Sequence, residues 1–184
     1  MPGHKTALVN KTLNNAFIVV IKNYFKTFVM NDIAAPKVSI FVSYSHEDEE
    51  MKKELDKYLK VLKRSGKVET WNDRELIAGQ EWDAAIMLEL NKANIILLLI
   101  SVDFNASDFI WDKELASAMK RHEEGSAYVV PVVLRKCEWR SLPYAKLQAL
   151  PRNATPVTEY TNRDEAFTEI AIGIEKLVDF IRAK

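Results

Sequence analysis

The sequence predicts an α/β fold: a flavodoxin-like, doubly wound sheet of about five parallel strands, preceded by an extra N-terminal amphipathic helix. Two observations support this prediction. After residue 36, short apolar runs alternate with longer segments in which apolar residues recur at helical spacing. Hydrophobic residues make up 48% of the 184 residues, which is enough to cover both faces of a parallel sheet.

The predicted strands are short and rich in branched apolar residues. The run 94–101, NIILLLIS, is the most hydrophobic, so we expect it inside the sheet. The other predicted strands are 37–43, 67–71 and 127–134, with 154–157 (ATPV) as a short last strand.

Helices are predicted at 46–66, 81–93, 107–125 and 163–184. The first begins with a run of acids, Glu47 to Glu50, which suits the positive end of the helix dipole. In the third, Trp111, Leu115 and Ala118 share one apolar face, and Glu114 lies at the edge of that face. Segment 102–110 is expected to be a loop.

Residues 1–36 are expected to form an amphipathic helix and a linker, and residues 37–184 the main domain. Apolar residues recur at helical spacing over 12–30, and Pro36 excludes helix just before it. We expect this helix to pack on the domain or on a second copy; contact with a membrane surface is the alternative. If Met30 is the natural start, the leader is incidental.

Composition narrows the classes of function. Lys plus Arg and Asp plus Glu number 26 each, so no overall positive field favours direct nucleic-acid binding. The single cysteine, Cys137, excludes an internal disulfide and suits a reducing compartment, and the apolar run AFIVVI is too short to span a membrane. We therefore expect a cytoplasmic protein. The three histidines are scattered without metal-ligand spacing, so no metal is expected.

Motifs for phosphate binding and acyl transfer are missing from the sequence. The five glycines form neither G-x-G-x-x-G nor a P-loop, and no serine lies in G-x-S-x-G. A phosphoacceptor receiver domain would use Asp103 after the third strand, but it also needs an acidic pair after the first strand and a lysine after the last. The first strand ends in SYSH, and the last offers no lysine, so this alternative is disfavoured.

In a doubly wound sheet, ligands bind beyond the carboxyl ends of the strands. Glu114 begins the helix that follows the third such end, so the carboxylate is expected near this rim. Its structural alternative is an ordinary solvated glutamate.

Five motifs in order resemble a bacterial-type Toll/interleukin-receptor (TIR) domain. They are IFVSYSHEDEE, WNDRELIAGQEW, ANIILLLIS, IWDKELASAM and VVPVVL, and the resemblance runs from about 37 to 182. It implies one of two activities: assembly with other TIR domains as an adaptor, or cleavage of NAD at the nicotinamide–ribose bond in anti-phage or cell-death systems.

Trp111 and Glu114 match the tryptophan and glutamate that the resemblance associates with the NAD-cleaving members. The chemistry is coherent, because the pyridinium of NAD departs as a neutral ring and needs no second carboxylate to protonate it. We therefore expect an NAD glycohydrolase with Glu114 as the catalytic residue, no cofactor beyond its substrate NAD, and a linear or cyclic ADP-ribose product; the alternative is a non-catalytic adaptor. The expected substrate-binding residues are Ser43, Tyr44, Ser45, Asp73, Trp82 and Trp111.

The expected partners follow from the same resemblance. It implies that TIR domains stack through the loop at 72–80, so we expect a homo-oligomer or filament. A sensor domain or a partner protein is a further expectation; neither the trigger nor the form of the oligomer can be read from the sequence.

Overall fold

The computed structural model describes residues 36–71, 82–108 and 110–184, except for the side chains of Trp82 and Asp112. Residues 37–184 form one compact unit. The helix expected at 12–30 and the loop expected at 72–80 lie outside the described residues. None of the described helices is long and apolar enough to cross a membrane.

Four parallel strands form the sheet over the described part of the chain, in the order β2-β1-β3-β4. They are β1 (Val38–Ser43), β2 (Val68–Trp71), β3 (Ile95–Ile100) and β4 (Tyr128–Val133). β3 lies inside the sheet, as its hydrophobicity predicts. The strand order reverses between β1 and β3, which is the switch point where doubly wound folds bind ligands.

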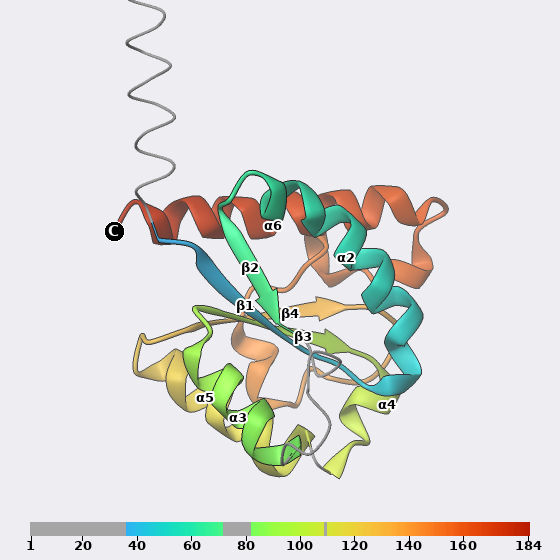
Figure 1. Ribbon diagram of the computed structural model, residues 1–184. Helices are drawn as coiled ribbons and strands as arrows, with labels where there is room; N and C mark the ends of the chain where they lie inside the picture. The colour runs from blue at the N-terminus through green and yellow to red at the C-terminus, as the bar shows by residue number, and fades with distance from the viewer. Residues whose placement is uncertain (1–35, 72–81, 109) are drawn as a thin grey trace, which may run out of the picture. The chain divides into compact units, whose positions relative to one another are not determined.

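Helices cover both faces of the sheet (Figure 1). α2 (Glu49–Arg64) and α6 (Arg163–Arg182) pack on one face, and α3 (Trp82–Lys92) and α5 (Ala116–Glu123) on the other. The predicted α/β class is therefore confirmed. Shorter helical segments are η1 (His46–Asp48), α4 (Val102–Asn105), η3 (Ile110–Leu115), η4 (Pro143–Lys146), η5 (Arg152–Ala154) and η6 (Val157–Glu159).

β3 explains why helices are needed on both sides. All six of its residues are fully buried, and they alternate between the two cores. Leu97 and its odd-numbered neighbours face α2 and α6, while Leu98 and its even-numbered neighbours face α3 and α5. A strand that is apolar on both faces cannot leave either one in water.

The prediction of a short last strand at 154–157 is wrong. This segment instead spans the end of η5 and the start of η6, and Asn153 and Ala154 have left-handed φ angles of 61° and 55°. Pro156 has no N–H to donate to a ladder, which disfavours a strand here.

Leu150 occupies the place beside β4 through a single parallel bridge to Val132. Its carbonyl accepts the Val133 N–H at 2.8 Å. Along the same outer edge the Val129 N–H donates to His122 Nδ1 at 3.3 Å, and Pro131 has no N–H. Of the backbone amides on the side of β4 that faces away from β3, those of Val129 and Val133 already have acceptors, and Pro131 has no N–H.

Two local expectations are corrected. The segment expected as a loop at 102–110 includes α4, which begins because the Ser101 hydroxyl accepts the Phe104 N–H at 3.0 Å as an N-cap. The helix expected at 107–125 is not one regular helix, because a π-helical turn, η3, precedes α5.

Candidate functional site

Glu114 lies at the carboxyl edge of the sheet and is buried, with 6% of its surface exposed. Ser43, the last residue of β1, donates its hydroxyl to Glu114 Oε2, and Ser43 is itself buried. A buried carboxylate is costly unless hydrogen bonds compensate for lost water. Ser43 provides such a bond from the neighbouring element.

Glu114 lies within the π-helical turn η3. In a regular α-helix Glu114 would lie on the margin of the apolar face, close to Trp111. A π-turn takes more residues per turn, so Glu114 lies further around the helix axis from Trp111 than it would in an α-helix, while it stays near the face of Ile110. Ile110, Glu114 and Leu115 are all buried, whereas Trp111 is half-buried.

A cavity of about 250 Å³ adjoins this carboxylate. Its wall combines apolar side chains with hydroxyl groups, an imidazole and the carboxylate. The lining residues are Phe41, Val42, Ser43, Tyr44, Ser45, His46, Trp71, Ile86, Ser107, Ile110 and Glu114.

Tyr44 is fixed at the end of β1 by contacts from α2. Its hydroxyl donates to Glu49 Oε2 at 3.2 Å, and the Lys52 ammonium lies 5.6 Å from the centre of its ring. Ser45 caps η1, where its hydroxyl oxygen accepts the Glu47 N–H at 3.4 Å. Both residues therefore have local structural roles as well as a place in the cavity wall.

The structure brings together four of the residues expected at the site: Ser43, Tyr44, Ser45 and Glu114. Trp111 does not line the cavity, because its indole N–H donates to the carbonyl oxygen of Asn105 at 2.7 Å. Asp73 and the side chain of Trp82 lie outside the described residues. His46, Ser107 and Trp71 also line the cavity and were not predicted from the sequence, although His46 and Trp71 each stand at or just beyond a predicted strand end.

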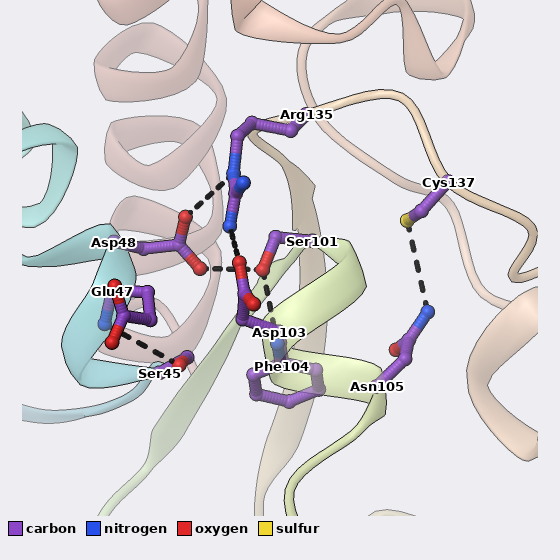
Figure 2. A network of polar contacts seen from close by, with 9 residues as sticks. All are labelled: Ser45, Glu47, Asp48, Ser101, Asp103, Phe104, Asn105, Arg135 and Cys137. Atoms are coloured by element: carbon purple, nitrogen blue, oxygen red, sulfur yellow. Dashed lines mark hydrogen bonds and ion pairs between the residues drawn. The ribbon is translucent and has the colours of Figure 1, made fainter.

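A second polar cluster joins the ends of β1, β3 and β4 (Figure 2). The buried Asp48 carboxylate accepts hydrogen bonds from Arg135 Nε at 2.8 Å and from the Ser101 hydroxyl at 2.5 Å. Arg135 also pairs with Asp103, and this hydrogen bond is the main cause that raises the pKa of Arg135. From the sequence, Asp48 was expected only as one of the acids at the positive end of a helix dipole. Its position after β1, opposite an arginine that follows β4, was the available signal.

Cys137 lies beside this cluster and receives a hydrogen bond from the Asn105 amide at 3.6 Å (Figure 2). Burial raises the pKa of the Cys137 thiol, so it stays protonated and is a poor nucleophile. No group of three or more His, Cys, Asp or Glu side chains within the described ranges has a geometry that could hold a metal ion.

Comparison with known proteins identifies the fold family. The family model for the TIR domain matches residues 40–170. An uncharacterized protein of Sinorhizobium fredii, y4lF, is 46% identical over 138 residues, which are 75% of this chain and 43% of that protein. The chain thus spans less than half the length of this curated relative.

Two solved structures were also found. The TIR domain of the Toll-related receptor TRR-2 from Hydra magnipapillata has a TM-score of 0.48 at 18% identity, covering 74% of this chain and 97% of that one. The RPS4 and RRS1 TIR domain heterodimer has a TM-score of 0.49 at 13% identity, covering 76% and 96%. The family model, which matches most of the chain, decides the assignment: this chain belongs to the TIR domain family.

Proposed function

We propose that this TIR domain cleaves NAD at the bond between nicotinamide and ribose, with Glu114 as the catalytic carboxylate. The observation that supports the proposal is a buried carboxylate in the wall of a cavity at the carboxyl edge of the sheet. A glutamate with only a helix-surface role would have no reason to be turned inward against Ser43.

The chemistry needs one negative charge near the ribose. As the C1′–N bond breaks, both bonding electrons go to the ring nitrogen, so nicotinamide leaves neutral and positive charge develops on the ribose. Glu114 stabilises this charge, and the Ser43 hydroxyl orients the carboxylate. Water then adds to C1′ and loses a proton, giving ADP-ribose; attack by a nitrogen of the adenine ring of the same molecule would give the cyclic product.

The size of the cavity bears on how much of NAD it holds. Its volume of about 250 Å³ is below the roughly 300–1,000 Å³ typical of small-molecule sites, so the cavity suits the nicotinamide and ribose end of the molecule. We propose that the adenine half binds beyond the described wall, against another copy of the domain. The setting we propose is a cytoplasmic, bacterial immune or cell-death response.

The decisive experiment is to incubate the purified protein with NAD and to measure nicotinamide and ADP-ribose. Glu114→Gln keeps the size of the side chain but removes the charge, so nicotinamide release should fall by roughly 10²–10³-fold or more. Glu124→Gln, an exposed position beyond the end of α5, is the matched control and should retain wild-type activity.

Wild-type turnover in Glu114→Gln would reject the assignment of this residue. A folded wild-type protein that releases no nicotinamide at any concentration would instead favour the adaptor, the alternative expected from the sequence.

A further inference from the structure

The cavity has an aromatic wall, which is formed by Trp71 and Phe41. Trp71 is the last residue of β2 and pairs with Phe41 in the register between β2 and β1. Their rings stack with centroids 5.5 Å apart and planes inclined by 11°. Both residues border the cavity, and Trp71 is half-buried.

The aromatic wall and the carboxylate lie a short way apart on the same face of the sheet. Phe41 and Ser43 are two residues apart on β1, so their side chains point to the same side, separated by roughly 7 Å along the strand. Ser43 donates its hydroxyl hydrogen bond to Glu114, so the carboxylate lies near the Ser43 end of this stretch of β1. The cavity therefore presents a flat π-surface near one end and a negative charge near the other.

Trp111 does not supply this wall, although the sequence made it the expected aromatic residue of the site. Its indole N–H is bound to the Asn105 carbonyl, and its side chain packs in the core around α5. Trp71 comes instead from the end of β2 and was not among the expected residues.

We propose that Trp71, backed by Phe41, forms a subsite for a flat cationic ring of the N-alkylpyridinium class. A π-surface and a carboxylate both attract such a cation, and a neutral ring of the same shape loses both attractions. If the proposed function holds, on which this identification of the ring rests, the ring is the nicotinamide of NAD. It binds while charged and is released once bond cleavage has made it neutral.

This role predicts a particular kinetic signature. The attraction between Trp71 and the ring is present in the bound substrate and weakens as the ring loses its charge. Trp71 therefore lowers KM without raising kcat. Glu114, in contrast, acts on charge that develops in the transition state and controls kcat.

The test measures binding of two probes that cannot be cleaved: the 1-methylnicotinamide cation and neutral nicotinamide. Ligand-detected NMR titration reports binding without using tryptophan fluorescence, so removing Trp71 does not remove the signal. The wild-type protein should bind the cation more tightly than the neutral ring. Trp71→Leu should weaken cation binding roughly 5- to 30-fold and neutral binding much less, and Trp71→Phe should lie between.

Trp139→Phe is the matched control, because Trp139 stacks on Tyr144 with an interplanar angle of 12° and does not line this cavity. Trp71→Phe also keeps an aromatic ring beside Phe41, so the test stands if Trp71→Leu fails to fold. Equal binding of the two probes by wild-type protein, or undiminished preference for the cation in both Trp71 variants, would overturn the proposal.

The outcomes also separate this inference from the proposed function. If the protein binds the cation through Trp71 but never cleaves NAD, the subsite is supported and the hydrolase function is rejected. If both Trp71 variants cleave NAD with the KM of the wild-type protein, the hydrolase function is supported and the subsite is rejected.

Discussion

Asp48 and Asp103 bind the same guanidinium from very different surroundings. The Asp48 side chain is 0% exposed, and the Asp103 side chain is 39% exposed. Removing one partner of a buried ion pair leaves an uncompensated group, whereas an exposed pair is weak because water competes for both ions.

We therefore expect Asp48→Asn to lower the free energy of unfolding by about 3 kcal/mol, toward the lower end for buried pairs because Arg135 keeps Asp103 and partial contact with water. Asp103→Asn, the matched control, should cost less than about 1 kcal/mol. Urea unfolding measures both. An equal decrease in the free energy of unfolding for the two variants would show that the burial of Asp48 does not strengthen its interaction with Arg135.

At this scale the sequence predicted the residue types of the candidate site better than their contacts. Ser43, Tyr44 and Ser45 follow directly from the end of a predicted strand. The bond from Ser43 to Glu114 spans 71 positions in the sequence and depends on how far η3 turns. The pairing of Asp48 with Arg135 spans 87 positions and could be found only once both were placed on the same sheet edge.

Among the elements, α2 and α6 are joined by a tyrosine. The Tyr58 hydroxyl, on α2, donates to the Asp164 carboxylate in the first turn of α6. This hydrogen bond, with burial as a smaller cause, raises the pKa of Tyr58 from 10.0 to about 12. The unfolded chain therefore releases this proton at a lower pH than the folded one.

The raised pKa of Tyr58 makes the free energy of unfolding fall at high pH. A raised folded-state pKa contributes stability that is complete below the unfolded pKa of 10.0 and is lost as the pH rises toward about 12. Urea unfolding at about pH 9 and about pH 11 should show the loss, and Tyr58→Phe should show less of it. An identical pH dependence in the two proteins would mean that the Asp164 bond is not formed in solution.

Elements with a clear apolar pattern were predictable, and local irregularities were not. All four main strands and α2, α3 and α6 lie within the expected ranges, because the strands are short apolar runs and the helices are longer segments bounded by polar residues. The π-turn η3 was missed because a helical pattern read at the α-helical period cannot register a wider turn. No strand forms at 154–157, because Pro156 interrupts the apolar residues and Ala154 itself has a left-handed φ angle.

At the scale of the whole molecule, the role of the N-terminal segment can be tested by deletion. Residues 12–30 carry lysines on the polar face expected for a helix, so they should either stabilise the domain or bind anionic vesicles. Deleting residues 1–29 and measuring the free energy of unfolding and sedimentation with anionic and neutral vesicles distinguishes these roles. Unchanged stability and binding would show the segment to be incidental.

Self-association should control activity. We expect segment 72–80, which lies outside the described residues, to complete the site through contacts between copies, because ordering a loop costs entropy that an assembly can offset. Specific activity should then rise with protein concentration and fall in Ile77→Asp. Activity that stays constant from nanomolar to tens of micromolar, in a protein that sediments as a monomer throughout, would contradict this.

The outer edge of β4 limits the form that such an assembly can take. An exposed sheet edge invites a strand from a second molecule, and repeated additions build a cross-β fibre. β4 cannot serve as such a template, because His122 and Leu150 already accept its outward Val129 and Val133 amides and Pro131 has none to give. Copies of this domain that met at β4 would therefore have to associate through side-chain surfaces, and such an assembly should dissolve on dilution, as fibres of continuous sheet do not.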